Sequence, residues 1–501
     1  MKKARKLLIG RVSAIAAMIA LQLALVVAII AGLSEAWTYL YWVLQAASIA
    51  AVLWILSKPD NPSYKLAWCI PIALFPVFGG LFYLMFGNRC LNRRLRPRPQ
   101  MELEGNHTVD RLAGESPLLA RQAAYVARVS GFPLYHGGAA EYFPLGEDQW
   151  ASLLDELAKA ERFILMEYFI IQPGRMWDAV LEVLRRKAAE GVEVKLMYDD
   201  LGSIRTLPVG YSRQLAEMGI EAAVFNPCRP RLSSVMNYRD HRKITVIDGR
   251  VGYCGGINLA DEYINAYPKH GHWKDTAVLI RGEAVASLTR MFLSLWEFAS
   301  GVRLDPARYR AEAAPAAGMD GFVQPFGDAP LDGCNLSENI YMQMVNCARR
   351  YVYITTPYLI LDNEMITALS VAAQSGVDVR IVTPHVADKW FVHMVTQANY
   401  AQLTAAGVRI YEYTPGFIHA KMLVCDDEVC MVGTANLDYR SFYLHFECGV
   451  LFYRSSMARQ VRRDVEAVLA VSEEILPEKA REISRHRLLL RALLRAFAPL
   501  M

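Results

Sequence analysis

Apolar side chains dominate the first 90 residues in three long stretches, whereas apolar and polar positions alternate afterwards. Residues 12–33 carry no charged side chain and are long enough to cross a bilayer, which needs about 20 apolar residues. Residues 37–56 follow after three residues, so we expect a tight transmembrane hairpin. A secretory signal peptide would be shorter and would end in a small-residue cleavage site. Residues 66–87 are also apolar, but two prolines and a glycine pair interrupt them.

Basic residues flank this membrane segment (residues 1–90) on both sides, and they constrain its topology. Five precede the first stretch and five follow the third: Lys2, Lys3, Arg5, Lys6 and Arg11, then Arg89, Arg93, Arg94, Arg96 and Arg98. Basic flanks favour the cytoplasm, so three full spans would leave the two clusters on opposite faces. A third segment that bends and returns removes the conflict, because Pro71, Pro76, Gly79 and Gly80 favour a bend. We expect the part of the chain after this segment to lie in the cytoplasm; the alternative is three spans with that part outside.

Downstream of the membrane segment, apolar strands alternate with amphipathic helices in an order that occurs twice. The matching strands are 163–171 with 351–360, 191–200 with 376–385, and 218–225 with 406–413. The order strand, helix, strand, helix, strand, motif, strand predicts two similar α/β halves with largely parallel sheets. The expected parts are a basic linker at 91–125, a first half at 126–304, a linker at 305–321 and a second half at 322–501.

Each half contains one copy of the pattern His-x-Lys-x-x-x-x-Asp. The copies are HRKITVID, with His241, Lys243 and Asp248, and HAKMLVCD, with His419, Lys421 and Asp426. An asparagine stands ten residues after each aspartate, and an acid follows later: Asn258 and Asp275, then Asn436 and Glu447. A single copy of so short a pattern arises by chance, whereas two copies with the same asparagine spacing inside a repeat do not. The motif strands ITVID and MLVCD should be buried and should each form a hairpin with the next strand.

Two such motifs in one site suit covalent chemistry on a phosphodiester. One histidine can attack phosphorus and form a phosphohistidine, while the other protonates the leaving alcohol and later deprotonates the acceptor. The lysines, with Asn258 and Asn436, would stabilise the phosphate charge, so we expect no metal or other cofactor. Asp275 and Glu447 could each accept an imidazole N–H and fix its tautomer.

Other residues receive structural interpretations. The aspartates that end the motifs, Asp248 and Asp426, are expected to brace the catalytic groups rather than to touch substrate. Five histidines lack a comparable context and are expected at the surface or in structural positions: His270, His272, His385, His393 and His445. Trp273 and Tyr439 are expected to be packing residues.

At these residues the chain resembles the phospholipase D superfamily, whose hallmark is the duplicated motif, and more narrowly the bacterial cardiolipin synthases. The similarity runs over about residues 60–500, through NPSYKLAWCIPIALFPVFGG, MEYFII, YDDLGS, GGINLADEY, TTPYLI and GTANLDYRSF. It implies a transphosphatidylation in which two phosphatidylglycerols give cardiolipin and glycerol, with His241 as nucleophile and His419 as general acid and base. A hydrolytic phospholipase D or another phosphatidyl transferase is the alternative. Many relatives have two apolar segments, whereas this chain has an extra one.

Charge and the C-terminal segment refine this picture. The net charge of +4 over 501 residues does not indicate nucleic acid as a partner, and a nuclease is disfavoured for that reason. The apolar N-terminus instead favours lipid substrates and a multi-pass location in the bacterial inner membrane. Residues 481–501 combine arginines with a leucine-rich face, so this helix could pack on the catalytic part or lie on the membrane. A homo-oligomer is left open.

Overall fold

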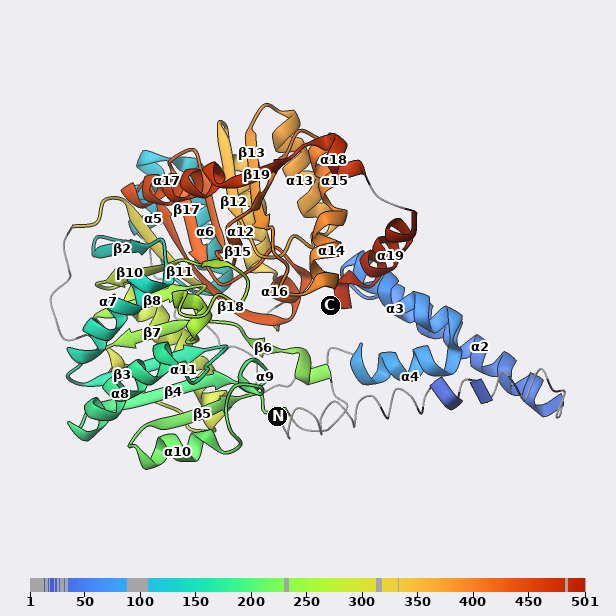
Figure 1. Cartoon of the computed structure of the whole chain (residues 1–501), viewed down its shortest axis with the longest axis horizontal. Helices are drawn as coiled ribbons and strands as arrows, with labels where there is room; N and C mark the ends of the chain where they lie inside the picture. The colour runs from blue at the N-terminus through green and yellow to red at the C-terminus, as the bar shows by residue number, and fades with distance from the viewer. Residues whose placement is uncertain are drawn as a thin grey trace.

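The computed structural model describes residues 35–87, 107–228, 234–311, 318–331, 333–482 and 485–500, together with scattered positions between 13 and 31. Most of the predicted stretch 12–33, both basic clusters and part of the predicted linker 305–321 lie outside the described residues. Two mixed α/β halves form the body of the molecule, and the helices of residues 35–87 project from it (Figure 1).

The first half is built on a seven-stranded sheet in the order β2–β10–β8–β7–β3–β4–β5. The strands are β2 (Ala139–Phe143), β3 (Phe163–Tyr168), β4 (Glu193–Asp199), β5 (Glu221–Phe225), β7 (Ile244–Ile247), β8 (Val251–Gly255) and β10 (Ala277–Arg281). The helices are α7 (Gly146–Ala158), α8 (Arg175–Ala189), α9 (Asp200–Ser203), α10 (Tyr211–Glu217) and α11 (Val285–Ser300). Buried residues of α7 and α8 share one core with the sheet, and α11 packs into another core on the side of the second half.

The second half repeats this arrangement. Its strands β18–β17–β16–β12–β13–β14 follow the same order as β10–β8–β7–β3–β4–β5. They are β12 (Tyr351–Thr355), β13 (Asp378–Pro384), β14 (Arg409–Tyr413), β16 (Met422–Cys425), β17 (Val429–Gly433) and β18 (His445–Tyr453), with β11 (Phe322–Asp328) and β19 (Ser472–Ile475) outside them. The helices are α12 (Leu336–Cys347), α13 (Asn363–Gln374), α14 (Trp390–Ala398), α15 (Tyr400–Ala405), α16 (Tyr439–Tyr443) and α17 (Ser456–Ala470).

The expectation of largely parallel sheets is wrong, because only β3–β4–β5 and β12–β13–β14 pair in parallel within the repeated order. The motif strands β7 and β16 run antiparallel to their neighbours on both sides. Each motif strand turns within three residues into the next strand, as the hairpin prediction requires, and such a short connection only permits antiparallel pairing. The parallel pairs lie on the side of each sheet away from the hairpin, where helices connect successive strands.

A shared core joins the halves into one body. Side chains of β7 and β16, together with α11 and α17, lie in one cluster of buried residues that includes Val246, Met422 and Val465. Two short parallel pairings also cross the boundary. β6 (Arg239–Asp240) of the first half pairs with β18, and β9 (His272–Lys274) pairs with β15 (Gly416–Ile418) of the second half. These crossings lie directly beside both motif histidines.

The boundary predicted for the first half needs correction. Residues 107–125, expected in a basic linker, belong to α5 (His107–Glu115) and α6 (Pro117–Ser130), and β1 (Tyr135–His136) pairs with β11. The buried face of α6, including Leu119, Ala123 and Val126, joins the core of the second half. This segment therefore packs on the second half although the first half follows it in the chain, because its apolar face matches α12 and β11.

Among the described residues, one helix is long and apolar enough to cross a bilayer, at Thr38–Leu56 within α2 (Glu35–Leu56). The third apolar stretch forms two shorter helices, α3 (Pro62–Leu74) and α4 (Pro76–Phe86), which separate at Phe75 and pack on each other and on α2. Pro76 begins α4, where its missing N–H is harmless. Gly79 lies just after this break and lets α4 approach α3 closely, since a Cβ there would meet the Pro71 carbonyl oxygen at 2.3 Å.

The C-terminal segment ends in α18 (Pro477–Arg481), α19 (Arg485–Ala496) and a 3-10 turn at Ala498–Leu500. α19 packs on α14 and also contacts α3, and the final turn lies against α3 and α16 (Figure 1). The other face of α19 is exposed: Leu488, Leu489 and Leu493 all point to solvent, with Leu489 76% exposed. One face of α19 thus packs on the protein, whereas its leucine-rich face is exposed.

The last aspartate of each motif fixes the start of a neighbouring strand. The Asp248 carboxylate accepts hydrogen bonds from the backbone N–H groups of residues 161–163, and Asp426 accepts them from residues 349–351. Both aspartates adopt φ of +55°. They tie the motif hairpins to β3 and β12 and lie at the opposite ends of β7 and β16 from the histidines.

We predict that Asp248→Ala and Asp426→Ala each lower the free energy of unfolding by about 3 kcal/mol, because leaving a buried donor unpaired costs about 1–3 kcal/mol. Thermal unfolding in detergent should show a lower midpoint for both variants. Asp155→Ala removes a carboxylate that contacts only Lys159 at the surface, and it should leave the midpoint unchanged. An unchanged midpoint in both motif variants would refute the bracing role.

Candidate active site

Backbone hydrogen bonds across the boundary between the halves position both motif histidines. His241 follows β6, and its N–H donates to the Phe446 carbonyl of β18 at 2.9 Å. His419 follows β15, and its N–H donates to the Lys274 carbonyl of β9 at 2.7 Å. Each histidine is therefore held by the strand that carries or precedes the acid of the other half. Both side chains are almost buried.

Each histidine is paired with the acid of the opposite half. Nδ1 of His241 lies 3.0 Å from both carboxylate oxygens of Glu447, and Nδ1 of His419 lies 2.6 Å from Oδ2 of Asp275. Both carboxylates are fully buried. When Nδ1 donates to a carboxylate, Nε2 carries the free lone pair and can attack or accept a proton. The site therefore exists only when the two halves pack together.

The two acids have different surroundings. Glu447 also accepts a hydrogen bond from the Thr434 hydroxyl, while Asp275 accepts one from the Thr276 N–H at 2.8 Å. Burial alone would raise the pKa of Asp275, but the adjacent His419 and Lys421 lower it below its usual value. Asp275 is thus held as a carboxylate against His419.

Both motif lysines are buried beside the histidines. The Lys243 ammonium donates to the His241 carbonyl at 2.6 Å, and Lys421 Nζ lies 2.8 Å from Nδ1 of His419 and donates to the His419 carbonyl. Burial lowers the pKa of Lys243 to about 8 and that of Lys421 to about 7. A lysine with so low a pKa gains most from an anion nearby, so both are suited to bind a phosphate.

Burial also lowers the pKa of both motif histidines. For His241 the charges of Lys243 and Lys421 add to burial and hold the pKa well below its usual range. For His419 burial and Lys421 lower the pKa to about 4, against the opposing effect of Asp275. Both imidazoles are therefore neutral in the free enzyme at neutral pH, which is the state required of a nucleophile.

The two motif asparagines differ in how their side chains are used. Asn258 accepts from the Ile170 N–H at 2.9 Å and donates to the Tyr263 hydroxyl at 2.7 Å. Asn436 donates to Asp438 at 3.2 Å, while its Oδ1 has no hydrogen-bond partner among the described residues. Asn258 is thus engaged inside the protein, and Asn436 retains one free amide oxygen.

Aromatic rings and a third histidine complete the site. Trp273 and Tyr263 pack against His419 with ring centroids 5.4 and 5.5 Å away, so Trp273 is a packing residue that packs on a site histidine. The His445 ring lies 5.3 Å from that of His241 and is buried, although its sequence context indicated a surface or structural position. A signal was present in the sequence, because His445 precedes Glu447 by two residues, as Trp273 precedes Asp275.

Among the described residues, one group has the spacing of a metal site: His241, His445 and Glu447, with ligand atoms within 4.8 Å of one another. The hydrogen bonding does not fit a metal. Nε2 of His445 faces Nε of Arg440 at 3.3 Å, and an arginine N–H can only donate, so the imidazole proton lies on Nδ1. That proton occupies the lone pair that a metal would need.

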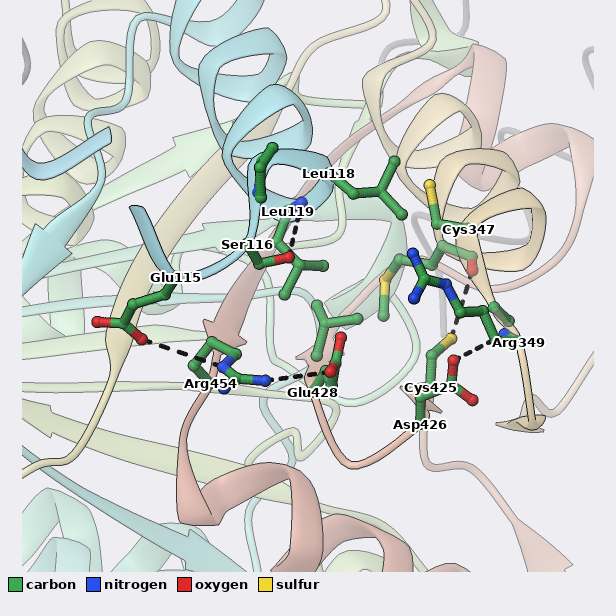
Figure 2. Close-up of a pocket in the computed structure, with 14 residues that line it drawn as sticks. Glu115, Ser116, Leu118, Leu119, Cys347, Arg349, Cys425, Asp426, Glu428 and Arg454 are labelled. Carbon is green, nitrogen blue, oxygen red and sulfur yellow. Dashed lines mark hydrogen bonds and ion pairs between the residues drawn. The ribbon is translucent and has the colours of Figure 1, made fainter. Parts of the chain in front are cut away.

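A pocket of about 370 Å³ lies elsewhere in the second half (Figure 2). It is lined by the ends of α5, α6 and α12 and by the turn after β16, including Arg349, Cys425 and Asp426. β16 separates this turn from Lys421, so the pocket is distinct from the histidine site.

Comparisons with known proteins agree with the fold and the motifs. The family model described as cardiolipin synthase, PLD-like domain, matches residues 153–296 and 341–469, and a phospholipase D-nuclease N-terminal model matches residues 46–88. Among solved structures, phosphatidylserine synthase from Haemophilus influenzae Rd KW20 superposes with a TM-score of 0.59 at 15% identity, over 76% of this chain and 97% of that one. The halves thus have the fold of phospholipase D-like enzymes.

Sequence relatives narrow the class. A cardiolipin synthase of Halalkalibacterium halodurans is 33% identical over 460 residues, covering 89% of this chain and 91% of its own. One of Geobacillus kaustophilus is 36% identical over 85% of this chain and 86% of its own. An uncharacterized protein of Streptococcus mutans is 41% identical over 85% of this chain and 94% of its own. The chain belongs to the cardiolipin synthase family, whose members are membrane-associated phosphatidyltransferases.

The lysine pKa values predict an alkaline limit to catalysis. Each lysine stabilises phosphate only when protonated, so kcat/KM should be highest below pH 7 to 8 and should fall as pH rises through that range. Where one group must be protonated, kcat/KM falls about tenfold per pH unit above the pKa of that group. A bound phosphate raises the lysine pKa, so kcat should decline only at higher pH. A kcat/KM that stays constant through pH 8 and beyond would contradict this role.

Proposed function

We propose that the chain transfers a phosphatidyl group from one phosphatidylglycerol to a second one, giving cardiolipin and glycerol. The observation that carries the proposal is the pair of histidines held by crossed carboxylates, His241 by Glu447 and His419 by Asp275. Exchange of one phosphodiester for another requires a nucleophile, a proton carrier and charge stabilisation. The two histidines supply the first two, and the two motif lysines supply the third.

The first displacement uses both histidines. Nε2 of His241 attacks phosphorus, the bond from phosphorus to the glycerol oxygen breaks, and His419 gives its proton to that oxygen. A bound phosphodiester is an anion, so it offsets the lysine charges that depress the pKa of His419 and favours the protonated form needed here. The Asp275 carboxylate stabilises this imidazolium at 2.6 Å.

The second displacement reverses these roles. His419, now neutral, takes the proton from a hydroxyl of the second phosphatidylglycerol, and the oxygen attacks phosphorus as the bond to His241 breaks. Lys243 and Lys421 stabilise the negative charge that spreads over the phosphate oxygens in both steps. The free oxygen of Asn436 is available to orient a hydroxyl of the bound lipid. Water as acceptor would instead give phosphatidic acid.

Purified protein in vesicles that contain phosphatidylglycerol should form cardiolipin and glycerol in equal amounts. His241→Ala and His419→Ala should each reduce turnover by about 10³-fold or more, since general acid–base catalysis alone contributes about 10²–10⁴. His385→Ala, at a half-exposed histidine beside Glu412, is the matched control and should retain activity. Phosphatidic acid as the main product would favour a hydrolytic phospholipase D, and activity in either motif variant would contradict the two-histidine mechanism.

The membrane segment supports a multi-pass location in the inner membrane with the catalytic halves in the cytoplasm. α3 and α4 have 13 and 11 residues, or roughly 20 and 17 Å at 1.5 Å per residue, against a hydrocarbon core of about 30 Å. Two helices of this length suit a segment that enters the bilayer and returns to the same side. Asn61, the N-cap of α3, donates to Asp362 and to the Tyr443 hydroxyl, and so attaches this segment to the second half.

We propose that the exposed leucines of α19 are a second contact between the protein and the bilayer. α19 contacts α3, whose Leu66 and Leu74 are also exposed, and arginines stand among the leucines in the sequence of α19. An apolar face with basic neighbours is suited to the interface of an anionic bilayer. The active site would then lie at the height of the lipid phosphates.

A polarity-sensitive fluorophore on Leu489→Cys should be quenched by lipids that carry a doxyl group in the acyl chain. The same fluorophore on Leu476→Cys, at an exposed leucine before α18, is the matched control and should respond only to a water-soluble quencher. If the probe at 489 behaved like the control, α19 would not lie on the membrane.

A further inference from the structure

The immediate surroundings of the two motif histidines differ at several equivalent positions, one of which stands two residues before each acid. Trp273, two residues before Asp275, lies against His419 with ring centroids 5.4 Å apart and ring planes at 39°. His445, two residues before Glu447, lies against His241 at 5.3 Å and 40°. The same geometry therefore places an indole beside one motif histidine and an imidazole beside the other. Trp273 offers no group to Asp275, whereas His445 can reach Glu447.

The protonation of His445 follows from its contacts. Nε2 faces the Arg440 N–H at 3.3 Å and accepts from it, which leaves the proton on Nδ1. Nδ1 lies 3.5 Å from Oε1 of Glu447, which is a close polar contact but not a hydrogen bond, and it has no hydrogen-bond partner among the described residues. Arg440 thus directs the N–H of a buried imidazole toward the carboxylate that His241 uses.

Glu447 therefore faces three N–H or O–H groups, two of which donate hydrogen bonds to it, whereas Asp275 accepts from two, the His419 Nδ1–H and the Thr276 N–H, and has no second imidazole beside it in the described part of the chain. The three are the Thr434 hydroxyl, Nδ1 of His241 and Nδ1 of His445. A carboxylate whose charge is shared among several donors is a weaker acceptor for each. The distances agree, since the histidine nitrogen is 3.0 Å from Glu447 but 2.6 Å from Asp275.

We propose that His445 is a positioning residue that shares Glu447 with His241, and that it thereby keeps His241 neutral for nucleophilic attack while His419 serves as the acid. The inference rests on the two-histidine mechanism proposed above. Asp275, which serves a single imidazole, stabilises an imidazolium and suits a group that must carry a proton. Glu447, shared, orients an imidazole without favouring its protonation. In this proposal the presence of His445 at the position equivalent to Trp273 contributes to the unequal roles of the two motif histidines.

Other charges around these groups are unchanged when residue 445 is replaced. His241 faces Lys243 of its own motif, and Lys421, His419 and Lys389 of the second half, all of which oppose its protonation. His445 faces Arg440 from α16, and His241 and Glu447 from the site. A difference between variants at 445 therefore reports on the contact with Glu447.

The experiment compares kcat/KM as a function of pH for the wild type, His445→Trp and His445→Asn, in the full chain and in phosphatidylglycerol vesicles. Tryptophan reproduces the other half and removes the N–H, so Glu447 should stabilise the imidazolium of His241. Protonated His241 cannot attack, so kcat/KM falls at low pH as His241 becomes protonated; we call this fall the acid limb. A raised pKa of His241 should move the acid limb to higher pH by about one unit, the change expected for one hydrogen bond to a carboxylate. Asparagine keeps an N–H close to the position of Nδ1 and should retain the wild-type limb.

His445→Leu provides a smaller apolar replacement and should shift the limb as tryptophan does, so the test does not depend on one variant folding. His385→Asn is the matched control, because His385 contacts Glu412 at 3.0 Å outside the site. Its profile should equal that of the wild type. An equal shift for asparagine and the apolar variants, or no shift for any of them, would overturn the proposal.

The test separates this inference from the proposed function. The acid limb can be followed through whichever product forms, cardiolipin or phosphatidic acid, so a different acceptor would leave the result readable. Activity in His241→Ala would overturn the two-histidine mechanism itself, whatever the variants at 445 show. Normal dependence on His241 with an unshifted limb would overturn only the role of His445.

Discussion

The hydrogen bond between each motif histidine and the carboxylate of the opposite half is the constraint on which the rest of the structure depends. A buried carboxylate is costly unless it is paired, and here the partner comes from across a domain boundary. The short parallel strands β6–β18 and β9–β15 bring each acid to its histidine, and the shared core around α11 and α17 holds both sheets in register. Neither half contains both members of a motif histidine–acid pair.

This dependence explains how a duplicated fold forms one active site rather than two. In each half the histidine precedes the motif strand, while the acid lies on or beside a strand that follows the motif strand in the chain. A rotation that relates the halves places the histidine of one beside the acid of the other. The same rotation makes the site nearly symmetric, so unequal roles require a local difference. The pair Trp273 and His445 is one such difference beside the histidines, and the proposed role of His445 rests on it.

The motifs predicted which residues lie together, because the repeat fixes their spacing; their catalytic roles stay a proposal. His241, His419, both lysines and both acids come together as the covalent mechanism requires, although the sequence could not show that each acid serves the opposite half. His445 was missed because an isolated histidine has no pattern of its own, and only its equivalence with Trp273 reveals it. The strands and motif hairpins were predictable from apolar runs and short turns.

The strand directions and one boundary were less predictable. Parallel pairing was inferred from alternating strands and helices, but the tight turns after Asp248 and Asp426 impose antiparallel pairing on half of each sheet. α6 packs on the second half although the first half follows it in the chain, and sequence order carries no signal for such a choice. The close approach of Gly79 to Pro71 was not predictable either, because it depends on which neighbour the glycine meets in the folded chain.

The central claim is that the histidine of one half depends on the acid of the other, and rapid quenching of the reaction tests it most directly. Phosphatidylglycerol labelled at phosphorus would be mixed with wild type and with Glu447→Gln, and the labelled histidine would be located by peptide mapping. The account predicts label on His241 in the wild type and its loss in Glu447→Gln, a change made in the second half. Undiminished label on His241 in that variant, or label on His419 in the wild type, would contradict it.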